Sequence, residues 1–208
     1  MSGVATVHVV DDDASTRELL AWLMKRNGIP VETYPDARAF LAACGRDDPG
    51  CVILDLDMPG MSGLDVQQGL KAQGIGMPVI FLSGRADVPR AVRAVREGAV
   101  DFIEKPFDYK RVLLLVRECL GRDASGRVQR ARRADASQRL AQLTAREREV
   151  LDRVVDGSTN REIAEELDIS VKTVEAHRAR VMEKLEVDSV AGLVQAVVAA
   201  RAEGSGGP

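Results

Sequence analysis

The chain has 208 residues, which is long enough for one large domain or two ordinary ones. Hydrophobic residues make up 45% of it and charged residues 29%, as in ordinary soluble globular proteins. The formal net charge of −3 gives no sign of a polyelectrolyte that binds nucleic acid through bulk charge. The apolar stretches, such as residues 112–116, are far too short to span a bilayer, so we expect no membrane partner.

The cysteines and the N-terminus indicate the compartment. Cys44, Cys51 and Cys119 are odd in number and lack metal-ligand spacing, so we interpret them as reduced, mostly buried thiols. The N-terminus enters a strand-like segment without the basic flank of a signal peptide. Together these features predict a cytoplasmic protein.

Apolar runs of strand length alternate with helix-like segments through about residue 120. The expected strands cover residues 4–10, 29–33, 51–54, 78–82 and 100–103. The expected helices cover residues 15–26, 37–44, 64–73, 88–97 and 108–120. Gly28, Gly74 and Gly98 follow three of these helices, where a left-handed residue ends a helix. This alternation predicts an α/β doubly wound, five-stranded parallel sheet over residues 1–120.

The composition changes at residues 121–138. This stretch holds five arginines among glycines, alanines and serines, and a single larger aliphatic residue, Val128. We interpret it as a linker that is helical in part at most. The sequence leaves open whether its arginines contact phosphates or only belong to a solvated tether.

Residues 139–202 have the pattern of a compact all-α domain with four helices. Each expected helix follows a hydroxyl side chain that can cap it: Thr144, Thr159, Ser170 and Ser189. Glu147 and Glu162 stand three residues after the first two of these, which completes two capping boxes. We expect residues 203–208 to form a disordered tail.

Chemically reactive side chains stand at the ends of four expected strands. Asp11 and Asp12 follow the first strand, Asp55 the third, Ser83 the fourth and Lys105 the fifth. Ligand sites in open α/β sheets collect at this edge. Three carboxylates in one crevice need a cation, and Mg²⁺ suits oxygen ligands while leaving room for phosphate oxygens. A carboxylate there can attack phosphorus, while a lysine and a hydroxyl bind the transferred group.

Residues 162–167, the turn at 168–170 and the helix that follows have the spacing of a helix-turn-helix. Val174, Val181 and Leu185 share one side of the second helix and should pack inward. Small and polar residues on the opposite side suit a major groove, and residues on the flanks suit phosphate contacts. The candidate DNA-contacting residues are Lys172, Thr173, Glu175, Ala176, His177, Arg178, Ala179, Arg180 and Lys184.

Spaced motifs run through the first 120 residues: Val9-Val10-Asp11-Asp12, residues 55–63 (DLDMPGMSG), Ser83-Gly84, and Gly98-Ala99 through Phe102 to Lys105-Pro106-Phe107. Together they resemble the receiver domain of two-component response regulators. The resemblance implies that Asp55 accepts a phosphoryl group from a sensor histidine kinase. It also implies that Asp11, Asp12 and Asp55 bind Mg²⁺ with the backbone carbonyl of Asp57. Ser83 and Phe102 would be the switch pair, and Lys105 the phosphate-binding lysine.

Asp57 adds a carboxylate two residues beyond Asp55, where the family varies. A negative charge there should alter the hydrolysis rate of an acyl phosphate. We therefore predict an unusual phosphoryl lifetime, whose direction the sequence leaves open.

Three stretches of the second half carry another resemblance: residues 143–151 (LTAREREVL), 159–164 (TNREIA) and 171–177 (VKTVEAH). They resemble the LuxR-type DNA-binding domain, and with the receiver they resemble the NarL/FixJ class of transcriptional regulators. This implies promoter DNA and RNA polymerase as partners. Because the second half is nearly neutral, dimers on paired half-sites would supply the phosphate contacts that a monomer lacks.

The resemblance also implies a homodimer that forms on phosphorylation. The surface of the fourth helix, fifth strand and fifth helix commonly joins receivers in this family. Here the surface would include parts of residues 108–117 together with Val88, Val92, Val95 and Arg96. The final helix, residues 190–200, is a second candidate for dimerisation.

Two other functions remain open. One is an aspartyl phosphohydrolase with Asp55 as nucleophile and Asp57 as general acid, although no cap domain is evident. The other is a phosphate-independent regulator whose first domain only dimerises or binds a ligand. Neither is favoured, because the first leaves the helical half unexplained and the second leaves a complete set of site residues unused.

Overall fold

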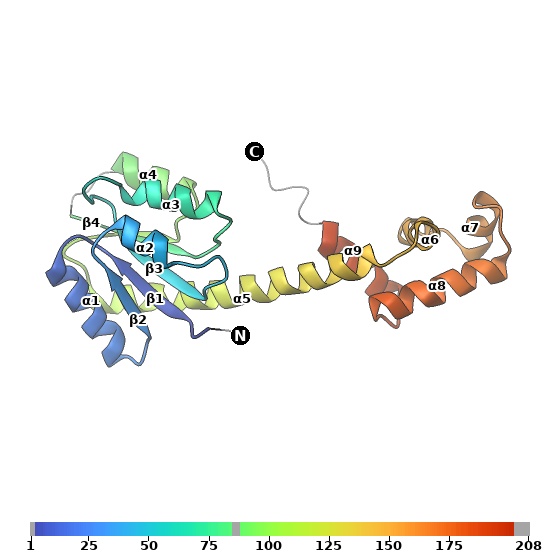
Figure 1. Cartoon of the computed structure of the whole chain (residues 1–208), viewed down its shortest axis with the longest axis horizontal. Coiled ribbons are helices and arrows are strands. Elements are labelled where there is room, and N and C mark those ends of the chain that lie inside the picture. The colour runs from blue at the N-terminus through green and yellow to red at the C-terminus, as the bar shows by residue number, and fades with distance from the viewer. Residues whose placement is uncertain (1–2, 85–87, 202–208) are drawn as a thin grey trace. The chain divides into compact units, whose positions relative to one another are not determined.

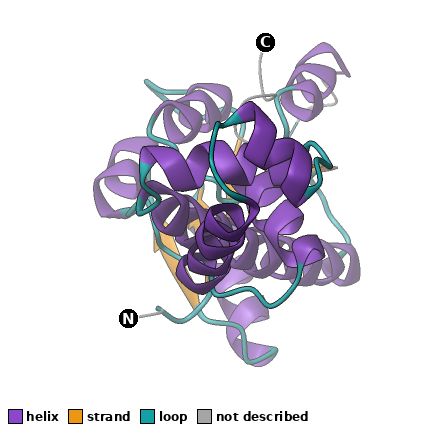
Figure 2. Cartoon of the chain, turned by 90° about the vertical axis from the view of Figure 1, so that its right-hand side faces the viewer, coloured by secondary structure: helices purple, strands orange, loops and turns teal. Residues whose placement is uncertain are grey.

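The computed structural model describes residues 3–84 and 88–201, and it divides the chain into two units, with the boundary between Arg127 and Val128 (Figure 1). Each unit is described separately below. The strands, orange in Figure 2, all belong to the N-terminal unit.

The N-terminal unit is built on five parallel strands in the order β2-β1-β3-β4-β5. Their bounds are β1 (Thr6–Val10), β2 (Val31–Tyr34), β3 (Gly50–Asp55), β4 (Val79–Ser83) and β5 (Asp101–Glu104). The predicted doubly wound parallel sheet is confirmed, and each predicted strand end lies within two residues of the observed one. The chain starts at β1, adds the edge strand β2 on one side and then β3, β4 and β5 on the other, which leaves the carboxyl ends of β1 and β3 side by side.

Helices cover both faces of this sheet (Figure 1). Their bounds are α1 (Ala14–Arg26), α2 (Ala37–Ala43), α3 (Gly63–Ala72), α4 (Val88–Arg96) and α5 (Tyr109–Ala141). One apolar core joins the sheet to α2, α3 and α4, and a second joins it to α1 and α5. Successive residues of β3 alternate between these cores: Val52 and Leu54 enter the first, whereas Cys51 and Ile53 enter the second. Because β3 is buried on both faces, its sequence is a continuous run of apolar residues.

Glycines end helices where the sequence predicts them. Gly28, Gly74 and Gly98 have φ angles of 68°, 70° and 90°, a backbone conformation that other residues rarely adopt. Gly50 has a different role, because a Cβ there would lie 1.9 Å from the carbonyl oxygen of Thr6. Only glycine lets β3 begin this close to β1.

Residues 121–138 are more ordered than the sequence predicts. They lie wholly within α5, which runs unbroken for 33 residues from Tyr109 to Ala141. The interpretation as a segment that is helical in part at most is therefore wrong. The stretch lacks an apolar periodicity, but its alanines, arginines and glutamines have high helix propensity, and the apolar turns of α5 before it supply the nucleus from which the helix continues.

The C-terminal unit contains only helices among its described residues. After the end of α5 come α6 (Ala145–Val155), α7 (Asn160–Glu166), α8 (Val171–Leu185) and α9 (Val190–Arg201). The predicted caps form, because the hydroxyls of Thr144, Thr159, Ser170 and Ser189 each accept a backbone N–H three residues on. Both predicted capping boxes are present. The predicted tail, residues 203–208, lies outside the described residues.

The core of this unit is formed by one side of each helix, including Val150, Ile163, Val174 and Leu193. Among the described residues of the chain, no helix combines the length and the apolar composition that crossing a membrane requires.

Candidate functional site

Three carboxylates meet at the carboxyl edge of the sheet. Val10 pairs with Leu54 in the β1–β3 ladder, so the next residues, Asp11 and Asp55, are neighbours. Asp11, Asp12 and Asp55 each offer an oxygen, and these oxygens all lie within 4.8 Å of one another. Asp11 and Asp55 are buried, whereas Asp12 is exposed. The site is thus open to solvent on the side of Asp12.

Lys105 binds two of these carboxylates at once. Its Nζ donates to Asp11 Oδ2 at 2.7 Å and to Asp55 Oδ1 at 2.8 Å. Its backbone N–H donates to the carbonyl of Ser83 at 2.7 Å, which fixes the start of the side chain beside β4. Burial lowers the pKa of Lys105, but its hydrogen bonds to Asp11 and Asp55 outweigh this and raise the pKa overall. The lysine is therefore a permanent positive charge at the site.

Backbone amides orient the carboxylates. The N–H of Asp57 donates to Asp55 Oδ2 at 2.9 Å, and the N–H of Asp13 donates to Asp11 Oδ1 at 2.9 Å. Burial raises the pKa of Asp11, although the hydrogen bond from Lys105 works in the opposite direction. The third aspartate of the run, Asp13, is the N-cap of α1 and accepts from the amides of Ser15 and Thr16. It is therefore separate from the acid cluster.

The donor set fits a hard divalent cation. All three clustered side chains present carboxylate oxygens, and one of them faces solvent, from which metal-bound water can come. Mg²⁺ is usually held by one or two carboxylates and several waters, which matches this open arrangement. The predicted fourth ligand is the backbone carbonyl of Asp57, which lies in the loop directly after β3.

The side chain of Asp57 forms an ion pair with α4. Its Oδ1 lies 2.5 Å from Nη1 of Arg90, and both side chains are partly exposed. Sequence reasoning identified Asp57 but missed Arg90, because the two residues are 33 positions apart and no motif connects them. The loop after the predicted acceptor is thus joined to a helix of the predicted dimerisation surface.

Ser83 and Phe102, the predicted switch pair, lie on neighbouring strands. Ser83 is fully buried at the end of β4, and Phe102 is partly buried in β5 against the core under α2, α3 and α4. On α4 the side chains of Val92 and Val95 are 44% and 51% exposed, and Arg96 is also exposed. The side chain of Val88 lies outside the described residues.

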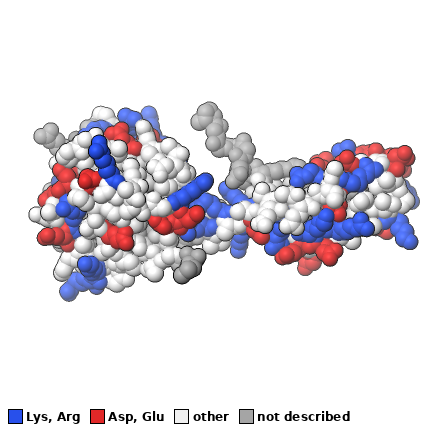
Figure 3. All heavy atoms as spheres, viewed as in Figure 1, with Lys and Arg blue, Asp and Glu red and all other residues white. Residues whose placement is uncertain are grey.

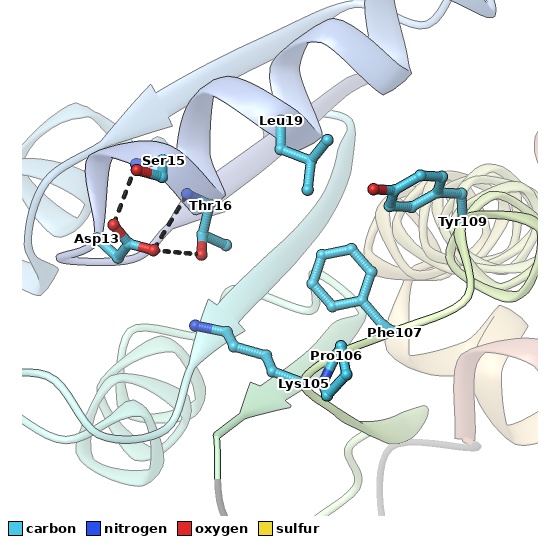
Figure 4. A pocket seen from close by; sticks show the side chains of 8 residues that line it. All are labelled: Asp13, Ser15, Thr16, Leu19, Lys105, Pro106, Phe107 and Tyr109. Carbon is cyan, nitrogen blue, oxygen red and sulfur yellow. Dashed lines mark hydrogen bonds between the residues drawn. The ribbon is translucent and has the colours of Figure 1, made fainter.

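A pocket of about 250 Å³ lies beside Lys105 (Figure 4). Leu19 of α1, Pro106 and Phe107 of the loop after β5, and Tyr109 at the start of α5 form its apolar part. Asp13, Ser15 and Thr16 form a polar edge, held together by hydrogen bonds. The structure therefore offers apolar surface immediately next to the predicted phosphoacceptor site.

The helix-turn-helix has the predicted arrangement. Asp168 in the turn has a left-handed φ of 53°, and α8 begins directly after Ser170. Val174, Val181 and Leu185 are buried, as predicted for the inward side of α8. The opposite side is free of core packing: Lys172, Glu175, Ala176, Ala179 and Arg180 are exposed.

Four of the predicted DNA-contacting residues are less available. Thr173 and His177 are half-buried, and Nη1 of Arg178 binds Asn160 Oδ1 of α7 at 2.5 Å. Nζ of Lys184 donates to Glu147 Oε2 at 2.6 Å and to the carbonyl of Gln142 at 3.2 Å. The structure thus gives Lys184 an internal partner rather than leaving it for DNA phosphates.

Glu147 has two tasks in this arrangement. It completes the capping box of α6, and it is the carboxylate that binds Lys184. The hydrogen bond from Lys184, followed by that from the amide of Thr144, lowers the pKa of Glu147 to about 2. The capping box was visible in the sequence, but the partner from α8 was not.

Two family models match the chain. Residues 7–117 match the response regulator receiver domain, and residues 141–199 match the bacterial regulatory proteins of the luxR family. Both matches agree with the observed units and with the resemblances found in the motifs.

Several known proteins are similar over nearly the whole chain. The transcriptional regulatory protein FixJ of Azorhizobium caulinodans is 45% identical over 189 residues, which cover 91% of this chain and 90% of that protein. The response regulator protein TodT of Pseudomonas putida is 40% identical, over 92% and 84% respectively. The solved structure of the response regulator StyR is 40% identical with a TM-score of 0.84, over 94% and 98%. Full-length FixJ from B. japonicum is 37% identical with a TM-score of 0.58, over 94% and 97%. The chain therefore belongs to the two-component response regulators, as a transcriptional regulator that joins a receiver domain to a LuxR-type DNA-binding domain.

Proposed function

We propose that Asp55 accepts a phosphoryl group from a histidine of a sensor kinase and that this modification controls DNA binding. The observation that carries the proposal is the double hydrogen bond of Lys105 to Asp11 and Asp55. It places a permanent positive charge against the carboxylate that would react. An ion pair that only stabilises the fold would not need a third carboxylate, nor a place at the edge of the sheet where ligands bind.

The transfer needs little beyond orientation and charge. A carboxylate oxygen of Asp55 attacks the phosphorus, the bond from phosphorus to the donor nitrogen breaks, and the electron pair stays on the donor imidazole. The amide of Asp57 and the ammonium of Lys105 hold Asp55 in one orientation for this attack. Lys105 then stabilises the additional negative charge of the phosphoryl oxygens. Asp11, Asp12, Asp55 and the Asp57 carbonyl would bind Mg²⁺, which supplies further positive charge for the same oxygens when it is bound.

A kinase domain must bring its histidine to this edge of the sheet. The pocket formed by Leu19, Pro106, Phe107 and Tyr109 supplies apolar contact area next to Lys105. We propose that the cognate kinase contacts this surface.

The response would pass from Asp55 to α4. A phosphoryl group on Asp55 attracts the hydroxyl of Ser83, and Phe102 on the adjacent strand can move into the space that becomes free. This alters the surface of α4, β5 and α5, where Val92, Val95 and Arg96 are exposed. A homodimer formed through this surface would bind paired DNA half-sites through α8 and bring RNA polymerase to, or reposition it at, a promoter.

Phosphorylation with a small phosphodonor tests this proposal. We expect incubation with phosphoramidate and Mg²⁺ to add one phosphoryl group to the chain, detected by intact-protein mass spectrometry and lost in Asp55→Asn. Asp108→Asn, which removes an exposed aspartate near the start of α5, is the matched control and should still be phosphorylated. Phosphorylation that persists in Asp55→Asn would contradict the assignment.

This experiment and an assay of phosphate release from small phosphate esters separate the two other functions. A phosphate-independent regulator would acquire no phosphoryl group. An aspartyl phosphohydrolase would release phosphate from small phosphate esters over many turnovers, whereas we expect a stable modification of Asp55.

A further inference from the structure

Positive charge is unevenly distributed within the DNA-binding unit. By sequence, residues 145–201, which contain α6 to α9, hold nine basic and twelve acidic residues and so carry −3. Residues 128–144, which contain the end of α5, hold four basic residues and one acidic residue and so carry +3. Duplex DNA carries about one negative charge per 1.7 Å of its axis, so the net charge of these four helices does not favour binding to it.

Many cations of α6 to α9 already have internal partners. Arg146 pairs with Glu149 at 2.7 Å, Arg153 with Glu166 at 2.5 Å and Lys184 with Glu147 at 2.6 Å. Arg148 donates to the carbonyl of Leu140 at 2.7 Å. On the face shown in Figure 3, basic and acidic side chains are accordingly interleaved over this unit. Four of the nine basic residues of these helices are thus already engaged within the unit, while Lys172 and Arg180 of α8 stay exposed.

A basic groove lies along the end of α5, with Ala200 of α9 at one side. The groove measures about 490 Å³ and is lined by Arg130, Arg133, Ala134, Ser137, Gln138, Ala141 and Ala200. Two guanidinium groups, a hydroxyl and an amide thus face one space, and none of the lining residues is acidic. The three alanines have short side chains, which leaves room for a ligand.

The chemistry of this groove suits a phosphate group. Arginine forks match the oxygens of a phosphate, and hydroxyl and amide groups add hydrogen-bond donors. Arg133 has no carboxylate within 4.0 Å in the described part of the chain. Binding an anion would therefore not require an existing ion pair of Arg133 to break.

The helix that forms most of the groove is hydrogen-bonded to α8. Nη1 of Arg139, at the end of α5, donates to the carbonyl of Leu185 at 3.2 Å, and Lys184 of α8 donates to the carbonyl of Gln142. The end of α5 is thus tied to the last turn of α8. When α8 lies in a DNA groove, these hydrogen bonds keep the end of α5 next to the last turn of α8.

We propose that the groove lined by Arg130, Arg133, Ser137 and Gln138 binds a backbone phosphate of DNA beside the site that α8 recognises. The contact is independent of sequence and supplies the positive charge that α6 to α9 lack. The second half of α5 is then part of the DNA interface, in addition to joining the two domains.

The salt dependence of DNA binding tests this directly. The probe is a fluorescein-labelled duplex of random sequence, titrated with the full, unphosphorylated chain between about 50 and 200 mM KCl and followed by fluorescence anisotropy. Arg130→Gln/Arg133→Gln should reduce the slope of log K against log[KCl] by about 0.9 for each lost phosphate. For one phosphate this corresponds to about eightfold weaker binding at 0.1 M KCl.

The matched control is Arg117→Gln/Arg122→Gln. It removes the same two charges from exposed positions of the same helix, but within the N-terminal unit. The control should keep the wild-type slope, and Arg133→Lys, which keeps the charge, should keep most of the affinity. Circular dichroism at 222 nm checks that each variant retains its helices.

Three results would overturn the proposal. An unchanged slope in the Arg130/Arg133 variant would show that the groove makes no phosphate contact. Equal losses in this variant and in the control would show an effect of net charge alone. If the wild-type chain does not bind the duplex at any of these salt concentrations, the unphosphorylated chain has no non-specific DNA binding and the proposal is wrong.

Discussion

Lys105 is the residue on which the charge balance of the acid site depends. It lies between two buried carboxylates, and without it Asp11 and Asp55 would face each other with no nearby cation. We predict that Lys105→Ala lowers the free energy of unfolding of the receiver domain by about 3 kcal/mol in the presence of EDTA, because buried charges lose their partner. Urea denaturation followed by circular dichroism measures this.

Addition of Mg²⁺ provides the control for this prediction. A divalent cation that binds the folded site stabilises it, and it should restore much of the stability lost in Lys105→Ala. An equal deficit with and without millimolar Mg²⁺ would show that the lysine acts through packing and not through charge.

Asp57 and Arg90 form a partly exposed ion pair, a kind that typically contributes about 0 to 1 kcal/mol to stability. We therefore expect a change of Asp57 to affect the decay rate of phosphorylated Asp55 more than the stability of the fold. We predict that Asp57→Asn changes the decay rate of phosphorylated Asp55 by at least about threefold, a small part of what a well-placed polar group contributes to catalysis, while the free energy of unfolding changes by less than about 1 kcal/mol.

Decay is followed by mass spectrometry after the phosphodonor is removed. Arg93→Ala, which removes a cation of α4 that pairs with Glu97, is the control and should leave the decay unchanged. The idea fails if Asp57→Asn decays like the wild type.

Glu147 gives the DNA-binding domain a specific pH dependence. Its pKa in the folded state is about 2, below the ordinary value of 4.5, so the folded state favours the charged form. Its contribution to stability is complete above about pH 4.5 and is lost as the pH falls from 4.5 towards 2.

Glu147→Gln keeps a side chain that can complete the capping box but removes the charge that binds Lys184. We predict a loss of about 1 to 2 kcal/mol at pH 7, the usual value of a hydrogen bond to a charged group. The difference between variant and wild type should shrink as the pH falls to 3. Hydrogen exchange of α6, measured by mass spectrometry at several pH values, tests both statements, and a difference that is independent of pH would contradict them.

Among the elements, α5 departs most from what its sequence indicates. Its first turns pack Val112, Leu115 and Val116 against the sheet, and this apolar periodicity was visible. The continuation to Ala141 was not visible, because residues 124–139 are all exposed or half-exposed and show no apolar pattern. Gly121 also lies directly after these apolar turns, and glycine is unfavourable inside a helix.

Gly121 is a place where the continuity of α5 can be strengthened. A Cβ at this position would have no heavy atom within 4 Å, and its backbone is helical. Gly121→Ala should therefore stabilise the helix by about 0.5 to 1 kcal/mol. Gly50→Ala is the opposing case, since its Cβ would collide with Thr6, and it should destabilise the receiver by several kcal/mol. Thermal unfolding compares the two, and a destabilised Gly121→Ala would contradict the continuous helix.

The sequence predicts the remaining helices and strands better than it predicts the side-chain contacts between them. Apolar runs of strand length, glycines that end helices and hydroxyl side chains that cap them are all local patterns. The sheet and the four C-terminal helices could therefore be predicted from the sequence. The meeting of Asp11, Asp12 and Asp55 followed as well, because parallel strands bring their carboxyl ends to one edge. The partners of Asp57 and Lys184 did not, because such pairs depend on how helices pack and leave no trace in local spacing.

At the scale of the whole molecule, the proposed activation depends on two copies meeting through α4. Val92 and Val95 are 44% and 51% exposed on this helix, so they present neighbouring apolar surface that a second copy can cover. We predict that Val95→Asp leaves phosphorylation of Asp55 intact but weakens dimerisation of the phosphorylated chain at least tenfold, because the carboxylate would have to be desolvated in the interface.

Sedimentation of the phosphorylated chain measures this effect, and Val4→Asp is the matched control because Val4 is 72% exposed near the N-terminus. Val4→Asp should dimerise like the wild type. Weaker dimerisation of Val95→Asp should also reduce binding to DNA with two half-sites, since each monomer then binds without its partner. If Val95→Asp dimerises normally after phosphorylation, the surface of α4 is not the one through which the signal reaches DNA.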